Sequence, residues 1–288
     1  MYDLNITDDH VRQYADDGFI SFDKFLEPHE IDLLRSRVEP LFRGEWQTGL
    51  APDEVNWQEG RDRDGKTRQL CNTWKADYQV ASVVLKETVG RVAAQLSGWY
   101  GTRIHLDNII WKPPGASGLV MHQDGSYNHY MVPNRLTSLW MALDDTSAAK
   151  GTVLYVKGSH RWGVAPKPKS FLTDDYLAPM HEAARVAGIA NPEVVPIEVP
   201  AGGLAIHCEW LWHGSGPNVA DKPRRAIVAH CTPDITRFHP TNAGNVYIRY
   251  RKRDDTGMDE SYFPILWTRD GYRTPWLDGY MAKAKEFR

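Results

Sequence analysis

The sequence predicts a mainly β protein in which a helical N-terminal layer packs on a jelly-roll-like core of antiparallel strands. Three observations predict this class. The first hundred residues carry amphipathic helical patterns, whereas after residue 101 short apolar segments follow one another with turn residues between them. Strands that succeed one another without helices are typical of a sandwich or barrel rather than a parallel α/β sheet. A chain of 288 residues, 42 % of them hydrophobic, can also bury a large core.

The N-terminal layer is predicted from cap and stop residues that flank apolar stripes. Its expected elements are a helix over 8–17 between Thr7 and Gly18, a short strand within 19–26, a helix over 28–42 that starts with Pro28, and one helix over 79–98 that ends at Gly98. Threonine before a helix and glycine after it are common caps, and proline suits the first turn. Pro40 should bend or end the second helix. Residues 44–77 are polar and are expected to form a long loop, either a lid or a solvated insertion.

The β core is predicted from seven apolar segments bounded by turn residues. They cover residues 102–111, 118–124, 135–145, 151–160, 193–199, 202–210 and 224–231. One helical stretch over roughly 173–187 interrupts them and ends at Gly188. We expect one domain over 1–288, with mostly helical support in 1–100, the β core in 101–235 and a C-terminal lid or tail in 236–288.

The composition limits which binding partners and which cellular compartment are expected. The net charge of −3 implies no polyanion, so no nucleic-acid partner is expected. The acidic N-terminus lacks the apolar stretch of a secretory signal, and no segment has the length of an apolar membrane span. Three widely spaced cysteines argue against a disulfide framework and suit a reducing cytoplasm. The sequence leaves the oligomeric state open.

Pairs of a histidine and an acid two residues apart are the main candidates for metal ligands. The pairs are His122 with Asp124, His105 with Asp107, and His207 with Glu209. Chance alone predicts about one His-x-Asp in such a chain, so each pair taken singly is weak. Side chains at i and i+2 of a strand share a face and can occupy two adjacent positions on one metal. Two histidines and one carboxylate leave the opposite face open, which suits non-haem Fe(II) enzymes that activate O2. A structural zinc site would instead be closed by four ligands, usually cysteines.

The third ligand is expected on a late strand, where His207, His213 and His230 are the candidates. His213 is followed eleven residues later by Arg224, which begins an apolar strand, and His207 has no such partner. A guanidinium that projects into a barrel requires an anion. A dicarboxylate cosubstrate would supply one at its far end.

Four stretches together resemble the phytanoyl-CoA dioxygenase (PhyH) family of Fe(II)/2-oxoglutarate-dependent oxygenases, which also contains ectoine hydroxylase. They are KPPGASGLVMHQDGSY, LWMALDD, GTVLYVKGSHRWG and HGSGPNVADKPRRAIVAH, and the segment TDDHVRQYADDGFISFDKFLEPHEIDLLRSRV is similar to the family's usual opening. The resemblance covers most of residues 7–235. It implies a double-stranded β-helix, the cupin-like jelly roll, with Fe(II), 2-oxoglutarate and O2 as cofactors or cosubstrates and ascorbate as an activator.

The family pattern also implies roles for individual residues. The implied iron ligands are His122, Asp124 and His213. Arg224 falls where the family binds the far carboxylate of 2-oxoglutarate, Ser215 matches a position near that carboxylate, and Trp140 matches an aromatic residue beside the cosubstrate. Tyr127 and His129 follow the metal motif and are expected to reach a small-molecule substrate. Lys112 and Asn108 are weaker candidates, because most such side chains are solvated.

The implied function is hydroxylation, desaturation or ring closure at an unactivated C–H bond of a small molecule in specialised metabolism. The alternatives are a non-catalytic jelly-roll protein that binds a small ligand, a cupin-like isomerase or hydrolase, and, at the level of substrate, an acyl-CoA hydroxylase. The tryptophans and arginines of residues 44–77 suggest a polar or anionic substrate with a flat ring, if they line the site.

Overall fold

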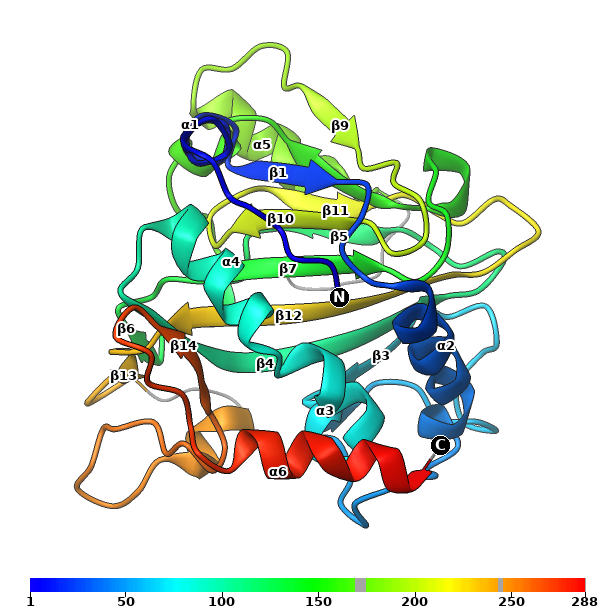
Figure 1. Ribbon diagram of the computed structural model, residues 1–288. Coiled ribbons are helices and arrows are strands. Elements are labelled where there is room, and N and C mark those ends of the chain that lie inside the picture. Colours follow the sequence, from blue (N-terminus) through cyan, green and yellow to red (C-terminus); the bar gives the residue numbers. More distant parts are fainter. Residues whose placement is uncertain (169–174, 243–245, 288) are drawn as a thin grey trace.

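Helices α1 to α4 all precede residue 101 and most of the strands follow it, as the sequence predicts (Figure 1). The computed structural model describes residues 1–168, 175–242 and 246–287. The helices are α1 (Asp8–Asp17), α2 (Pro28–Phe42), α3 (Tyr78–Val84), α4 (Glu87–Ser97), α5 (Ala178–Val186) and α6 (Leu277–Ala282). The strands are β1 (Phe19–Phe22), β2 (Glu54–Val55), β3 (Arg68–Cys71), β4 (Gly101–Lys112), β5 (Leu119–His122), β6 (Met131–Val132), β7 (Thr137–Ala142), β8 (Val153–Val156), β9 (Val194–Pro196), β10 (Leu204–Cys208), β11 (His213–Ser215), β12 (Arg224–Pro233), β13 (Arg237–Phe238) and β14 (Ile265–Thr268).

Two antiparallel sheets form the centre of the protein. Among the described residues, the larger sheet has the order β1-β10-β7-β12-β4-β3-β2, with β14 also pairing with β4. The smaller sheet has the order β5-β11-β8-β9, and β13 pairs with β6. Trp140 of the larger sheet and Tyr155 of the smaller one share a buried apolar cluster, so the two sheets pack face to face. The prediction of a jelly-roll core is confirmed.

The two faces of the larger sheet carry different residues, as the period of two in a strand requires. On β12, Ile227 and Ala229 belong to the cluster that also contains apolar residues of α2, α3 and α4, whereas Ala226 and Val228 belong to the cluster between the sheets. Helix α4 contacts β4, β7, β12 and β14 and crosses this outer face (Figure 1). Side chains at even positions from Arg224 to His230 therefore point into the space between the sheets, up to the irregularity that follows His230.

The N-terminal layer differs from its prediction at one helix. Residues 79–98 form two helices, because Lys86 adopts an extended backbone with φ −65° and ψ 145°. Its ammonium pairs with Glu30 on α2, and Asp77 caps α3 by accepting hydrogen bonds from the amides of Gln79 and Val80. The predicted stop at Gly98 is confirmed, with φ 69°. A tertiary ion pair thus interrupts a pattern that is continuous in the sequence.

Residues 44–77 are not the open loop that their composition suggested. They contain β2 and β3, which extend the larger sheet beyond β4. Trp57 and Trp74 lie in the main apolar core, and the guanidinium of Arg68 stacks 3.7 Å from the Trp57 ring centroid. The aromatic and basic residues of this segment therefore stabilise the edge of the sheet.

The remaining segments pack around this framework. Helix α2 ends at Phe42, two residues after Pro40. Helix α5 ends as predicted before Gly188, which has φ 73°, while residues 173–174 of the predicted helix lie outside the described residues. In the C-terminal segment, β14 pairs with β4 and α6 contacts α3. Within the described ranges, every helix is too short or too polar to span a lipid bilayer.

Candidate metal centre

Three of the predicted ligands meet between the two sheets. His122 ends β5 and His213 begins β11, and the two residues are direct partners in the antiparallel ladder. Asp124 follows β5 in the short 3-10 helix Asp124–Tyr127. Its Oδ1 atom lies 3.6 Å from His122 Nε2 and 3.5 Å from His213 Nε2, and one ligand atom from each residue lies within 4.8 Å of the others. Among the described residues, this is the only such group of three or more histidines, cysteines and acids.

Backbone carbonyls fix the orientation of both imidazoles. His122 Nδ1 lies 2.8 Å from the carbonyl of Val120, and His213 Nδ1 lies 3.0 Å from the carbonyl of Leu211. Since a carbonyl only accepts, each Nδ1 carries the proton and each Nε2 offers a lone pair. This arrangement presents the two Nε2 atoms to a shared metal position.

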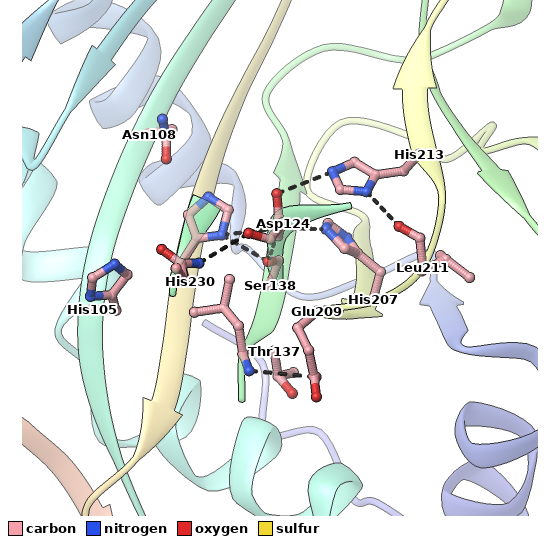
Figure 2. Close-up of polar contacts among 12 residues, drawn as sticks. His105, Asn108, Asp124, Thr137, Ser138, His207, Glu209, Leu211, His213 and His230 are labelled. Atoms are coloured by element: carbon pink, nitrogen blue, oxygen red, sulfur yellow. Dashed lines mark hydrogen bonds and ion pairs between the residues drawn. The ribbon is translucent and has the colours of Figure 1, made fainter. Parts of the chain in front are cut away.

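The carboxylate of Asp124 is held by its second oxygen (Figure 2). Oδ2 accepts hydrogen bonds from Ser138 Oγ at 2.9 Å and from His207 Nε2 at 3.1 Å, which leaves Oδ1 directed at the two ligand histidines. Burial alone would raise the pKa of Asp124, but the nearby imidazoles of His213, His122 and His207 hold it well below its usual value. The group is therefore an ionised, one-oxygen ligand candidate.

Two further histidines surround Asp124 as neutral rings. Burial lowers the pKa of His207 to about 3 and that of His230 to about 4. Because His207 Nε2 donates to Asp124, its Nδ1 accepts from the hydroxyl of Tyr155 at 2.8 Å. The chain from Tyr155 through His207 to Asp124 fixes the orientation of the carboxylate.

The structure separates the other two histidine–acid pairs from this position. Asp107 accepts a hydrogen bond from the amide of Trp74, and His105 Nε2 bonds to the Tyr130 hydroxyl. Glu209 pairs with Arg135, while His207 contacts Asp124 as described. Neither pair forms a second group of ligands among the described residues.

Two buried cations lie on the inner face of the larger sheet, beside the metal position. Arg224 on β12 and Lys112 on β4 are register partners, and their exposed fractions are 3 % and 0 %. Arg224 donates to the carbonyl of Gly151, and the ammonium of Lys112 donates to Ser215 Oγ at 2.8 Å and to the carbonyl of Gly216. Burial lowers the pKa of Arg224 to about 10, and burial together with the charge of Arg224 lowers that of Lys112 to about 6.

An anion would satisfy this pair of cations. Neither residue has an ion pair with an acid among the residues the structure describes, and unpaired buried charge is costly. The ring of Trp140 lies 5.6 Å from the Arg224 guanidinium carbon, and Ser215 lies beside Lys112. The structure thus brings Arg224, Ser215 and Trp140 together as predicted, and adds Lys112 in a stronger position than its residue type suggested.

One cavity of about 540 Å³ joins the metal position to Arg224 and Ser215, while Lys112 lies behind Ser215 outside the cavity lining. Tyr127 lines it, with its ring centroid 5.9 Å from that of His122. His129, also predicted to reach substrate, is exposed and lies outside the cavity lining, whereas its neighbours Asn128 and Tyr130 are buried and line the cavity. Trp57 and Trp74 are likewise absent from the lining, which removes the basis for a flat-ring or anionic substrate.

Sequence reasoning assigned no role near the metal to Ser138 or Tyr155, and it considered His230 only as an alternative third ligand. Ser138 and His230 are register partners on β7 and β12. The sequence signal for His230 is the period of two along β12. Positions 224, 226, 228 and 230 alternate with positions in the core beneath the helices, so a polar residue among them points into the space between the sheets.

A jelly roll with two histidines and a carboxylate around one position, next to buried cations, is the architecture of a non-haem iron oxygenase. The family model "Phytanoyl-CoA dioxygenase (PhyH)" matches residues 14–226. The chain belongs to the phytanoyl-CoA dioxygenase family.

Individual relatives agree with this membership. The chain is 31 % identical over 258 residues to "Phytanoyl-CoA dioxygenase 1" of Oryza sativa subsp. japonica, covering 78 % of this chain and 89 % of that protein. It is 24 % identical over 221 residues to the "Probable alpha-ketoglutarate-dependent hypophosphite dioxygenase" of Stutzerimonas stutzeri, covering 75 % of each. The crystal structure of the non-heme alpha ketoglutarate dependent carbocyclase SnoK from nogalamycin biosynthesis has the same fold, with a TM-score of 0.69, 20 % identity, and coverage of 91 % of this chain and 96 % of SnoK.

The protein is thus an oxidoreductase, a dioxygenase that depends on iron and 2-oxoglutarate. The residues present fit both groups. Two neutral imidazole nitrogens and one carboxylate oxygen suit Fe(II), and two buried cations without acidic partners suit a dicarboxylate.

Proposed function

We propose that this dioxygenase hydroxylates, or otherwise oxidises, an unactivated C–H bond of a small molecule, with His122, Asp124 and His213 as its iron ligands. The observation that carries the proposal is the meeting of these three ligand atoms in one cavity with the buried, acid-free guanidinium of Arg224, whose register partner is the buried Lys112. Bound iron would supply, together with 2-oxoglutarate and oxygen, the oxidising power for this reaction.

The cations give the far end of 2-oxoglutarate its position. Arg224 and Lys112 would bind the far carboxylate, with Ser215 Oγ as an additional donor and Trp140 as a wall beside the chain of the cosubstrate. Gly151 holds the guanidinium in place through its carbonyl, 2.7 Å from one terminal nitrogen. Because Arg224 is already fixed before the anion arrives, little side-chain entropy is lost on binding.

The residues around Asp124 give the metal its orientation. Ser138 and His207 occupy Oδ2, so only Oδ1 is left for iron, and the opposite side of the position opens to the cavity. Burial of the ligands, with exposed fractions of 7 % for both histidines, keeps bulk water away from the reacting groups.

A role in specialised metabolism is the finer part of the proposal. It is supported by the shared fold with the carbocyclase from nogalamycin biosynthesis. Tyr127 would contact the substrate, because its ring lines the cavity beside His122.

The test is succinate formation from 2-oxoglutarate by the purified protein with Fe(II), ascorbate and a panel of small molecules. We expect turnover that requires iron and is stimulated by substrate, with loss of iron binding in His213→Ala measured separately by equilibrium dialysis. Iron retained by His213→Ala at the wild-type level would reject the ligand assignment. Ligand binding without any consumption of 2-oxoglutarate would instead favour a non-catalytic jelly-roll protein.

A further inference from the structure

The substrate side of the cavity lies on the inner face of the larger sheet, beyond the metal position. Register aligns Trp140, Val228, Asn108, Cys71 and Glu54 across β7, β12, β4, β3 and β2. All five residues line the cavity. The β2–β3 extension of the sheet therefore supplies the wall that is farthest from the ligand histidines.

Asn108 presents a hydrogen-bond acceptor to this space. Its side chain is 5 % exposed, and its Nδ2 donates to the sulfur of Cys71 at 3.2 Å. Its Oδ1 is buried and has no hydrogen-bond partner within the described part of the chain. Buried amide oxygens are almost always paired, so a substrate N–H or O–H is the group that this atom lacks.

His230 presents a second acceptor, nearer to the metal position (Figure 2). Ser138 uses its only hydroxyl proton on Asp124 Oδ2, so it accepts from His230 Nδ1, 2.7 Å away. This hydrogen bond places the ring proton on Nδ1 and leaves Nε2 as the acceptor nitrogen. That atom has no partner in the described ranges, and the ring lines the cavity.

Glu54 presents a third acceptor at the far wall. The hydroxyl of Tyr247 donates to its Oε1 at 2.6 Å, and no described residue donates to its Oε2. Tyr247 itself lines the cavity, which ties the C-terminal segment to the same wall. The three acceptors thus come from β12, β4 and β2, and the distance from Asp124 increases across the sheet.

The same wall offers no free cation to an anionic substrate. Apart from Arg224, Lys66 is the only lysine or arginine among the described lining residues. Its ammonium donates to Asp62 at 2.8 Å and to the carbonyl of Asn56 at 2.9 Å, so its charge is already compensated. Leu106 and Leu136 complete the lining with apolar surface.

We propose, on the basis of the function proposed above, that the substrate is a compact ring or short chain whose hydroxyl or amino groups donate hydrogen bonds to His230, Asn108 and Glu54. The apolar residues would contact its C–H face. A substrate that enters this wall with a carboxylate, a phosphate or a long unsubstituted acyl chain does not match it, because such groups accept hydrogen bonds or make none.

The test measures binding and turnover separately on the protein loaded with Fe(II) and 2-oxoglutarate. Calorimetry under anaerobic conditions compares four probes: methyl α-glucoside, 2-aminocyclohexanol, cyclohexanecarboxylate and octanoyl-CoA. We expect one or both of the first two to bind at least about tenfold more tightly than the carboxylate and the thioester, the difference that a buried acceptor left unpaired produces. Equal or tighter binding of cyclohexanecarboxylate or octanoyl-CoA, or binding of no hydroxyl or amino probe, would overturn the inference.

Substitutions in the cavity wall then test whether its residues cause the selectivity among the probes. Asn108→Leu keeps the size of the side chain and removes the acceptor, and it should weaken the binding of the preferred probe about tenfold. Glu54→Gln should weaken the binding of 2-aminocyclohexanol more than that of methyl α-glucoside if the wall recognises an ammonium group. It should weaken the binding of both probes equally if the wall recognises a hydroxyl group. Glu59→Gln, in an exposed position of the same segment, is the matched control. Unchanged binding in both wall variants would refute the inference even where 2-oxoglutarate is consumed, whereas probe binding without consumption of 2-oxoglutarate would refute only the proposed catalysis.

Discussion

Replacing Lys112 with methionine should stabilise the protein in the absence of 2-oxoglutarate and weaken its response to 2-oxoglutarate. The ammonium is fully buried near Arg224, and these surroundings lower the pKa of Lys112 from 10.5 to about 6. A basic group whose pKa is lower in the folded than in the unfolded state destabilises the folded state at every pH below its pKa in the unfolded state. At pH 7 the cost is about 5 kcal/mol.

Part of this cost is offset by hydrogen bonds that methionine cannot make. Lys112 donates to Ser215 Oγ and to the carbonyl of Gly216, and losing both costs about 2–3 kcal/mol. Lys112→Met should therefore gain about 2 kcal/mol in the free energy of unfolding at pH 7. The gain should shrink as the pH rises from 7 toward 10, because the unfolded lysine then loses its proton and the cost to the wild type disappears.

Added 2-oxoglutarate should stabilise the wild type more than Lys112→Met and so reverse the order of their stabilities. The wild type pairs the anion with two cations, whereas the variant keeps only Arg224, so its affinity should fall at least about tenfold, or about 1.4 kcal/mol. Urea denaturation with and without 2-oxoglutarate, at pH 7 and pH 9, measures both effects, with the exposed Lys24→Met as control. A variant that is less stable than the wild type without ligand, or equally stabilised by 2-oxoglutarate, would show that Lys112 does not act as a buried cation awaiting an anion.

Three further substitutions test the remaining parts of the site. Asp124→Ala should abolish succinate formation, since the only carboxylate ligand is lost, and wild-type-like turnover would reject the ligand assignment. Arg224→Ala should weaken 2-oxoglutarate binding by about 2–5 kcal/mol, because an anion would be left with less charge compensation in a buried site; calorimetry with an unchanged affinity would remove Arg224 from that role. Ser138→Ala removes one of the two hydrogen bonds to Asp124 Oδ2 and should lower iron affinity about 10- to 100-fold in equilibrium dialysis, with no effect counting against an orienting role.

The sequence predicted the parts of the site that local spacing encodes. His122 and Asp124 are separated by one residue, and Arg224 follows His213 at a fixed offset, so both signals survive without a structure. Lys112 carries no such signal, because it becomes a site residue only through its register with Arg224 across two strands. Residue type alone favoured a solvated lysine, and pairing between strands reversed that expectation.

The errors in the predicted fold also arise from contacts between segments that are distant in the sequence. Strand β2 has two residues and β3 has four, which is too short for a period of two to stand out among polar residues. The break between α3 and α4 depends on the pairing of Lys86 with Glu30 from another helix. Both features are set by tertiary contacts, which local patterns do not contain.

The candidate site is built from residues of both sheets, so the spacing of the His-x-Asp motif alone does not assign it to a metal. The smaller sheet and the turn after it carry His122, His213 and Asp124, whereas the larger sheet carries Ser138 and His207, which hold the carboxylate. Arg224 and Lys112, which we propose to bind the anion, also belong to the larger sheet. The candidate ligands of the His-x-Asp motif therefore depend on packing between the sheets, which places a second set of residues around them, and the β2–β3 extension of the larger sheet lines the same cavity.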